Sequence, residues 1–295
     1  MNQTSAALHL NFSVQNDQTI LRVLKQEPPL RVIRAFPIKA ASAIATAPSP
    51  QGAQPVLVHL HNISGGLLGG DRLQLRAHVE AGAQAQITST GSTRVYRQRV
   101  GYPITTQISH LQVNSGGLLE YLPDTLIPYA RSQYRQSTRI ELADNAGLFY
   151  WEVVTPGREA KGECFEYDLL QIELDIWANG QPIAIERSQL EPKQAALNSA
   201  VKLGLFHYFA TFYICRVGIE AQRWLDLEKQ LDQLARSLTV AGQLVWGVSP
   251  LSAHGLSVRA VSTSSQAIQQ HLPCFWQMAK QALYQQNAVM PRKVY

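Results

Sequence analysis

The chain has 295 residues, of which 45 % are hydrophobic and 16 % charged, a composition that suits a packed core and argues against a disordered protein. The net charge of +5 comes from scattered basic residues, whereas nucleic-acid binders cluster them, so we expect no nucleic-acid partner. The three cysteines are far apart, and neither a signal peptide nor a membrane-spanning apolar stretch is evident. We therefore expect a cytoplasmic protein without a membrane partner.

The first two hundred residues carry the pattern of many short β-strands. Apolar residues alternate with polar ones or form short runs, and Gly, Pro, Asn or Asp bound each segment. The pattern predicts strands at Leu8–Val14, Val56–Leu60, Leu73–Val79, Ala83–Thr88, Ile104–Val113, Gly117–Tyr121, Arg139–Leu142, Leu148–Val154, Leu169–Trp177 and Ile183–Leu190. Such regular spacing indicates a sandwich, a barrel or a β-helical stack, and no internal repeat is evident that would favour a regular solenoid.

The remaining residues combine strands with helices. Strands are predicted at Gly204–Cys215, Leu244–Val248 and Leu256–Val261. Apolar residues at spacings of three and four predict helices over Ala221–Val240 and Ser264–Gln285, and Pro273 is expected to kink or restart the second one. We therefore expect a mainly β fold. A stacked or β-helical-like scaffold at residues 1–200 would carry a small C-terminal α+β layer with two helices at residues 201–295, packed together as one continuous domain.

A glycine-rich run spans His59–Leu73 and contains two Gly-Gly pairs. The spacing from Gly65 to Gly70 resembles a phosphate-binding loop, but Asp71 and Arg72 stand where that motif needs Lys and then Ser or Thr. Since a carboxylate would repel phosphate, we expect no nucleotide site here. Tight turns or close approach of two backbone segments explain the glycines well.

Two histidines of the same region, His59 and His61, share one face if the strand continues through them. Paired imidazoles can bind nickel, but no third ligand can be placed from the sequence. Structural histidines with satisfied hydrogen bonds are the alternative.

Catalytic motifs are missing from the sequence. No Gly-x-Ser-x-Gly, HExxH or Gly-x-Gly-x-x-Gly pattern is present, and no His or Asn can be tied to Cys164 as a nucleophile. We therefore expect that the chain is not an enzyme. An unrelated hydrolase with a Ser or Cys nucleophile would instead turn over small esters or amides.

Acidic residues interrupt three of the apolar strands. They are Glu120 in LLEYL, Glu152 in FYWEVV and Glu186 in IAIERS. Burying a lone carboxylate is costly, so each acid is expected to face a partner, water or a cavity. Pairing with an arginine such as Arg187, Arg158 or Arg94 is one explanation. A hydrated passage lined by oxygen ligands, which a divalent cation visits without being trapped, is the other.

Five blocks of the sequence, in the same order, resemble the signature of the UreD (also called UreH) family. They are Leu60–Leu73 (LHNISGGLLGGDRL), Ile87–Arg97 (ITSTGSTRVYR), Leu119–Ile127 (LEYLPDTLI), Trp151–Arg158 (WEVVTPGR) followed by Gly162-Glu163, and Met290–Tyr295 (MPRKVY). The sequence departs from the family pattern at Ile63, where Pro is frequent, and at Ser92–Arg94, where the family often has Ala-Thr-Lys.

The resemblance implies a non-catalytic, mostly β protein with a small helical portion near the C-terminus. Proteins of this family bind UreF, which recruits the GTPase UreG, and the complex docks on apo-urease. Nickel released from UreG is thought to pass through UreF and UreD to urease. A homodimer within that complex is a further implication by analogy. GTP chemistry belongs to UreG, in agreement with the missing phosphate-loop lysine.

Together these observations predict transient Ni²⁺ transfer and no permanently bound cofactor. Weak carboxylate stations suit conduction better than one tight cage, because a tightly held ion would not move on. The residues expected to line or support a passage are Asp71, Glu120, Glu152 and Glu186, with Thr93 and the pair His59 and His61 as weaker candidates. The alternative is a pure docking scaffold that recruits UreF and UreG to urease without contacting nickel.

Contact with a partner is predicted for the C-terminal helix and tail. An amphipathic helix with large aromatic residues can dock in a groove of another protein. The candidates are Leu272, Phe275, Trp276 and Tyr295. The alternative is that this helix covers the chain's own β core.

Overall fold

The computed structural model describes residues 5–38, 53–197, 199 and 202–291, and within them the strands form two sheets of seven and eleven strands. In spatial order the smaller sheet consists of β15 (Gln181–Leu190), β14 (Leu169–Ala178), β12 (Gln133–Leu142), β9 (Thr105–Val113), β6 (Arg72–Val79), β1 (Ser5–Gln15) and β2 (Gln18–Gln26). The main path of the larger sheet consists of β17 (Leu244–Pro250), β18 (Gly255–Ser262), β16 (Tyr208–Arg216), β13 (Gly147–Val154), β10 (Leu118–Tyr121), β7 (Gln84–Ser89), β5 (Val56–Asn62) and β3 (Leu30–Arg31). Its side branches are β4 (Ala35–Pro37), β8 (Thr93–Val95) and β11 (Leu126–Pro128).

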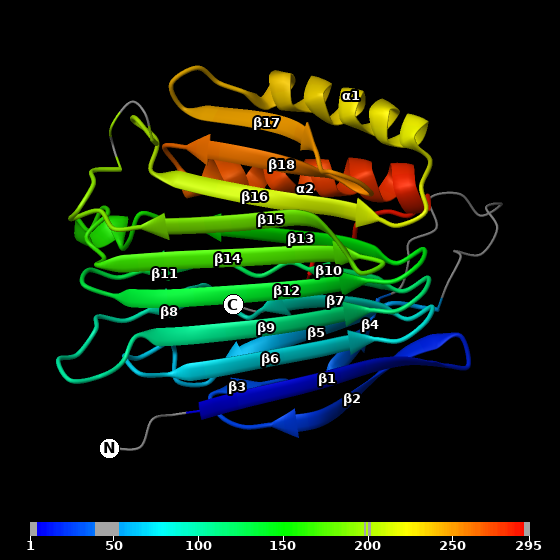
Figure 1. The fold of residues 1–295 in the computed structure, drawn as a ribbon, viewed down its shortest axis with the longest axis horizontal. Coiled ribbons are helices and arrows are strands. Elements are labelled where there is room, and N and C mark those ends of the chain that lie inside the picture. Colours follow the sequence, from blue (N-terminus) through cyan, green and yellow to red (C-terminus); the bar gives the residue numbers. More distant parts are fainter. Residues whose placement is uncertain (1–4, 39–52, 198, 200–201, 292–295) are drawn as a thin grey trace.

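Between β5 and β14 the chain alternates between the two sheets and so forms a coil. In the smaller sheet β6, β9, β12 and β14 pair in parallel, and in the larger sheet β5, β7, β10 and β13 do the same. Each turn of the coil therefore adds one strand to each sheet, and in Figure 1 the chain climbs from β1 and β2 at one end to β17 and α1 at the other. The prediction of a mainly β, stacked scaffold is confirmed.

Stacked turns join the sheets along one edge of the coil. The backbone N–H of Gly82 donates to the carbonyl of Ser115 at 3.1 Å, and that of Gly116 to the carbonyl of Asp144 at 3.0 Å. Gly82 and Gly116 have φ angles of +71° and +67°, which glycine adopts without steric cost. The small and polar residues that bound the predicted strands are therefore the residues of these turns.

The two sheets differ in how many of their faces are buried. On β12 exposed arginines such as Arg135 alternate with buried side chains such as Tyr134, because only the inner face of the smaller sheet is covered. On β13 the inner Tyr150 lies in the core between the sheets, while Phe149 and Trp151 lie in a second core beneath the helices. Burial of both faces explains why β10, β13 and β16 read as continuous apolar runs.

The C-terminal layer continues the larger sheet, since β16 pairs antiparallel with β13. Strands β18 and β17 follow, and the helices α1 (Ala221–Leu238) and α2 (Ser265–Tyr284) pack on this part of the sheet (Figure 1). A short 3₁₀ helix, η1 (Glu159–Lys161), precedes β14. The predicted order of strand, helix, strand pair and helix is confirmed. The division into residues 1–200 and 201–295 stays a prediction.

Helix α2 does not restart at Pro273 but runs through it as one helix, and the predicted kink there stays a prediction. A proline inside a helix costs about 3 kcal/mol, because it removes one hydrogen bond and crowds the preceding turn. The neighbouring Leu272, Phe275 and Trp276 are almost fully buried, and their burial offsets this cost at roughly 2 kcal/mol for each large side chain. Packing therefore holds the helix together. In the described part of the chain, no helix combines the length and apolar character that crossing a bilayer requires.

Candidate functional site

Glu152 lies on the inner face of β13 and points into the space between the sheets. Tyr150 shares this face, because side chains alternate along a strand. From the opposite sheet, Gln136 on β12 donates a hydrogen bond from Nε2 to Oε1 of Glu152. Burial raises the pKa of Glu152 to about 7, hydrogen bonds from Tyr150 and Gln136 oppose this rise, and the negative charge of Glu186 adds to it. Near neutral pH this carboxyl group is therefore partly protonated.

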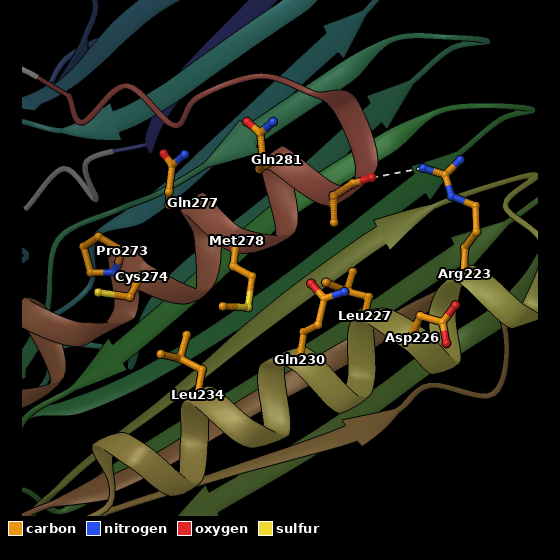
Figure 2. Close-up of a pocket in the computed structure, with 11 residues that line it drawn as sticks. Arg223, Asp226, Leu227, Gln230, Leu234, Pro273, Cys274, Gln277, Met278 and Gln281 are labelled. Carbon is orange, nitrogen blue, oxygen red and sulfur yellow. Dashed lines mark hydrogen bonds between the residues drawn. The ribbon is translucent and has the colours of Figure 1, made fainter. Parts of the chain in front are cut away.

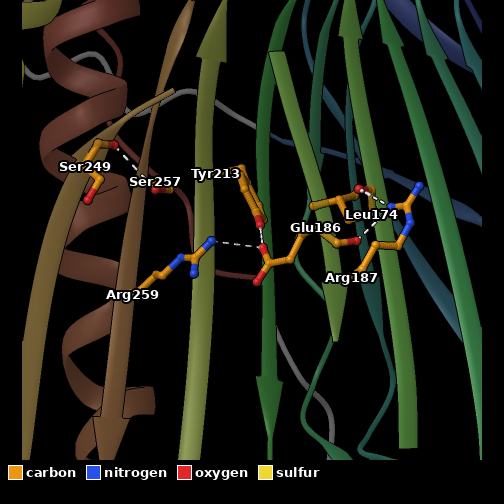
Figure 3. A network of polar contacts seen from close by, with 7 residues as sticks. All are labelled: Leu174, Glu186, Arg187, Tyr213, Ser249, Ser257 and Arg259. Carbon is orange, nitrogen blue, oxygen red and sulfur yellow. Dashed lines mark hydrogen bonds and ion pairs between the residues drawn. The ribbon is translucent and has the colours of Figure 1, made fainter. Parts of the chain in front are cut away.

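Glu186 reaches from β15, the edge strand of the smaller sheet, across to the larger sheet (Figure 3). Its Oε2 accepts a hydrogen bond from the hydroxyl of Tyr213 on β16. The same oxygen lies 3.2 Å from Nη2 of Arg259 on β18. Glu186 thus ties the two sheets together at one end of the coil.

The three arginines that the sequence offers as partners for the acids of the strands lie elsewhere. Arg187 turns away from Glu186 and pairs with Asp175, at 2.6 Å between Nη2 and Oδ1. Arg158 pairs with Glu163, at 2.9 Å between Nε and Oε2. Arg94 lies beside a cavity between the sheets, described below. Of these three arginines, none has a described ion pair with Glu120, Glu152 or Glu186.

Glu152 and Glu186 line the same cavity, which has a volume of about 640 Å³. It lies between β14 and β15 of the smaller sheet and β13, β16, β17 and β18 of the larger one, and most of its lining is apolar. A small cavity of about 40 Å³ adjoins it and shares Glu152 and Val154 with it. The lining of this small cavity also includes Gln136 and Thr93.

A third cavity, of about 200 Å³, follows on the other side of the small one. The two share Thr93, Gln107, Tyr121 and Pro123. The far part of the third cavity is lined by the glycine-rich loop at residues 65–67 and by residues 89–94. We call this series of three cavities the inter-sheet passage. Thr93, Glu152 and Glu186 all line it, although they are far apart in the sequence.

A row of tyrosines forms part of the wall of the passage. The rings of Tyr121, Tyr150 and Tyr213 stack across β10, β13 and β16, with centroids 5.4 Å and 6.1 Å apart. Burial, assisted by the charge of Glu152, raises the pKa of Tyr121 and of Tyr150 above the usual value. The hydroxyls of Tyr121 and Tyr150 therefore stay protonated at neutral pH and act as neutral hydrogen-bonding groups.

Glu120 lies on the opposite face of the larger sheet, beneath α2. Its carboxylate is 2.9 Å from Nζ of Lys280 and accepts hydrogen bonds from Trp276 Nε1 at 2.9 Å and Gln86 Nε2 at 3.3 Å. The side chains of Glu120 and Lys280 are only 2 % and 4 % exposed. The structure therefore places Glu120 outside the inter-sheet passage, in a closed network that joins β7, β10 and α2.

Asp71 is buried in the turn that leads into β6. It accepts a hydrogen bond from the backbone N–H of Leu68 at 2.9 Å, so it closes its own turn. Burial raises the pKa of Asp71, and the bond from Leu68 acts against this rise. Asp71 is not among the described residues that line the passage. Gly66, in the same loop, is required sterically, since a Cβ there would lie 2.8 Å from the carbonyl oxygen of Arg94.

His59 and His61 lie on β5, and their side chains are partly exposed. The ring of His59 packs edge-on against Phe36 at 5.8 Å between centroids. Burial lowers the pKa of His61, and the neighbouring His59 lowers it further. Across the described ranges, no group of three or more His, Cys, Asp or Glu side chains is placed to hold a metal ion. Metal binding by this pair stays a prediction.

Three of the four residues predicted to contact a partner lie in the core of the chain. Leu272, Phe275 and Trp276 are buried beneath α2, against the larger sheet, so they have no exposed surface for another protein. Their position matches the alternative, in which the helix covers the β core. Tyr295 lies outside the described residues.

An open groove of about 800 Å³ separates α1 and α2 on the outside of the molecule (Figure 2). Leu234 and Met278 give it an apolar floor, and at one end Arg223 Nη2 donates to the carbonyl of Ala282 at 3.0 Å. Asp226 is the only acid among the described residues that line the groove. The groove therefore lacks the paired carboxylates of the inter-sheet passage.

Several polar residues of the passage are not predicted by the sequence pattern. Gln107 and Gln136 face inward from β9 and β12, and Tyr213 and Arg259 reach Glu186 from β16 and β18. A signal for the two glutamines was present. Apolar residues near the ends of these two strands point inward. Because side chains alternate along a strand, every second residue before them faces the same way, and this rule places both glutamines on the inner face. The signal for Tyr213 and Arg259 is weaker, since it requires knowing which sheet lies opposite β15.

Comparison with known proteins gives the family of the chain. A family model described as "UreD urease accessory protein" matches residues 4–295. The "Urease accessory protein UreD" of Herpetosiphon aurantiacus is 42 % identical over 288 residues, which cover 98 % of this chain and 96 % of that protein. The protein of the same name in Pseudomonas fluorescens Pf-5 is 33 % identical and covers 83 % of this chain and 82 % of its own length. "Urease accessory protein UreD 2" of Pseudomonas syringae pv. syringae is 33 % identical, with 97 % and 93 % covered. This chain belongs to the UreD family of urease accessory proteins.

Proposed function

We propose that this chain is a non-catalytic scaffold for urease maturation that conducts nickel ions through the inter-sheet passage to apo-urease. In this function it acts with UreF, which binds it directly, and with UreG, which is recruited through UreF. Membership of a urease accessory family supports the first part of the proposal. The transient presence of Ni²⁺ in this chain is the finer part, and it rests on the passage.

One observation carries the proposal: three cavities in series place two carboxylates of distant strands on one route. Nickel accepts oxygen ligands, so Glu152 and Glu186 are suitable stations for it. The carboxylate of Glu152 has amide and hydroxyl partners and no described ion pair, and that of Glu186 pairs with the exposed Arg259. Partners of this kind leave room for a cation. Thr93 supplies a hydroxyl near the other cavities of the route.

The geometry also divides the residues that the sequence singled out. Glu152, Glu186 and Thr93 belong to the proposed route. Asp71 and Glu120 support it from outside, since Asp71 closes the turn before β6 and Glu120 fastens α2 to the larger sheet. We therefore assign nickel contact to the first group and folding to the second.

The test is the nickel content of urease matured in cells that co-express this chain, UreF, UreG and apo-urease. The Glu152→Gln/Glu186→Gln double variant keeps the shape of both side chains and removes both charges. We expect nickel per urease to fall roughly tenfold or more, as for removal of groups that support a metal site. Glu141→Gln is the matched control, because Glu141 pairs with Arg139 on the outer face of the smaller sheet.

The same experiment separates conduction from pure docking. If the double variant is still pulled down with UreF and apo-urease while nickel loading falls, the passage conducts the ion. If the complex itself is lost, the acids serve assembly, and the docking scaffold is the better description. Normal nickel loading by an intact complex of the double variant would refute the proposal.

A further inference from the structure

We propose that Arg259 is a displaceable counter-ion of Glu186, which holds this carboxylate until a divalent cation replaces the guanidinium group. The inference rests on the proposed function, since it concerns how the passage accepts its cargo. It assigns a regulatory role to a residue that does not itself bind the ion.

The ion pair lies in the wall of the largest of the three cavities of the passage. Glu186 extends from β15 and Arg259 from β18, so their contact of 3.2 Å spans the gap between the two sheets (Figure 3). Both residues line the 640 Å³ cavity that also contains Glu152. A cation that reaches Glu186, whether from Glu152 or from the other side, therefore meets a carboxylate that Arg259 already neutralises.

The exposure of the two side chains shows which of them can move. Arg259 is 60 % exposed, whereas Glu186 is 25 % exposed and is also held by the hydroxyl of Tyr213. On β17 the residue opposite Arg259 is Gly247, and a Cβ there would meet no atom within 4 Å. Open space therefore lies beside Arg259, and its long side chain can turn into solvent while Tyr213 keeps Glu186 in place.

Charge gives the exchange its direction. An ion pair with so much exposure is screened by water and salt, so the guanidinium is held weakly. A divalent cation carries twice the charge and can bind Glu152 as well as Glu186, whose negative charges repel each other when neither is neutralised. Lys202 is the other basic residue among the described ones that line this cavity, and its Nζ donates to the carbonyl of Ala195 at 3.2 Å. Arg259 is thus the described cation in contact with Glu186.

The test is a calorimetric titration of the purified full-length chain with NiCl₂ near neutral pH. Removing the competing guanidinium in Arg259→Gln should tighten Ni²⁺ binding about fivefold, the size of effect that a partly exposed ion pair supplies. Arg259→Lys keeps the charge and should restore the affinity towards that of the unmodified chain. Arg236→Gln is the matched control, because Arg236 pairs with Asp232 on the exposed face of α1.

Two further variants distinguish failure of the counter-ion role from failure of the proposed function. Arg259→Gln/Glu186→Gln should bind Ni²⁺ as weakly as Glu186→Gln alone, because Arg259 acts only through Glu186. If Glu186→Gln weakens binding but Arg259→Gln changes it less than twofold, the counter-ion role is wrong and the proposed function stands. If Glu186→Gln changes neither Ni²⁺ binding nor the nickel content of urease, Glu186 is not a station on the route, and the counter-ion role falls with it.

Thermal unfolding of each variant shows whether it is folded. Should Arg259→Gln unfold early, Arg259→Met replaces it, since methionine keeps the apolar stem that packs at the cavity edge. Arg259→Met should bind Ni²⁺ about fivefold more tightly than the unmodified chain, as expected for Arg259→Gln. An affinity equal to that of the unmodified chain, in a folded Arg259→Met variant, overturns the proposal.

Discussion

Glu120 and Glu152 stand on the neighbouring strands β10 and β13 of one sheet, yet they face opposite sides of it. Glu120 is enclosed beneath α2 with a lysine, a tryptophan N–H and a glutamine amide as partners. Glu152 faces a cavity, accepts hydrogen bonds from neutral groups and lies within electrostatic range of a second acid. In the first arrangement a buried cation satisfies the carboxylate, whereas in the second the carboxylate has neutral partners and faces a cavity.

An acid in an apolar strand is therefore not by itself a sign of ion transport. What distinguishes the two sites is how completely the carboxylate is satisfied and whether a cavity reaches it. Glu120 has a fixed cation in Lys280, and its network closes the packing between a helix and the sheet. Glu152 has no such cation in the described structure. Three predictions test this difference, and the largest effect comes first.

Removing the cation beneath α2 should cause the largest loss of stability. In Lys280→Met the carboxylate of Glu120 remains buried without a counter-ion, so the free energy of unfolding should fall by about 3–5 kcal/mol. Urea denaturation measures this change. Lys229→Met is the control, because Lys229 is 76 % exposed and lies 4.0 Å from Asp226. A loss no greater than that of the control would show that Glu120 does not depend on Lys280.

Removing the acid of the passage should instead stabilise the chain, and only at high pH. The pKa of Glu152 is about 7 in the folded chain and 4.5 as its ordinary value, so the unfolded chain loses this proton first as pH rises. Stability therefore falls between these two pH values and stays reduced above pH 7, by up to about 3 kcal/mol. Gln cannot ionise, so Glu152→Gln avoids this loss.

The measurement is urea denaturation of the unmodified chain and of Glu152→Gln at pH 5 and pH 8. The difference in unfolding free energy between the two proteins should shift in favour of the variant as pH rises. A difference that is the same at both pH values would mean that Glu152 keeps its ordinary pKa, and the contrast with Glu120 would lose its electrostatic basis.

The smallest effect is expected on the outer face of the smaller sheet. Glu141 and Arg139 form an ion pair of 2.7 Å, and both side chains are substantially exposed. Solvent screening limits such a pair to less than about 1 kcal/mol, so Glu141→Gln should barely change unfolding by urea. A loss as large as that of Lys280→Met would show that burial is not what separates the acids of this chain.

Much of the fold could be predicted from the sequence because its periodicity is clear. The boundaries of α1 and α2 are within two residues of those predicted, and most predicted strands are present. The strand predicted at Arg139–Leu142 was too short, since β12 begins at Gln133. The part that was not predicted, residues 133–138, carries Gln136 and Thr138 on the inner face, where an ordinary strand would carry apolar residues. Because these inner positions are polar, the alternation that predicts a strand is missing from this part of β12.

The placement of the acids was less predictable. The runs LLEYL and FYWEVV look alike, because both faces of β10 and β13 are covered and apolar residues occupy both. Period-two alternation cannot assign a face when neither face is polar. Only the pairing of the sheets and the position of α2 show that Glu120 and Glu152 point in opposite directions.

Helix α2 covers strands that precede it by a long stretch of chain, and this has a consequence for biosynthesis. β10 and β13 leave the ribosome well before Ser265–Tyr284 does, so Phe149 and Trp151 initially face water. A nascent chain with a bare apolar face is prone to aggregate at cellular concentrations. A stop codon before residue 265 should therefore yield inclusion bodies. The docking of α2, in which Lys280 pairs with Glu120, covers this apolar face and so protects the new protein from aggregation.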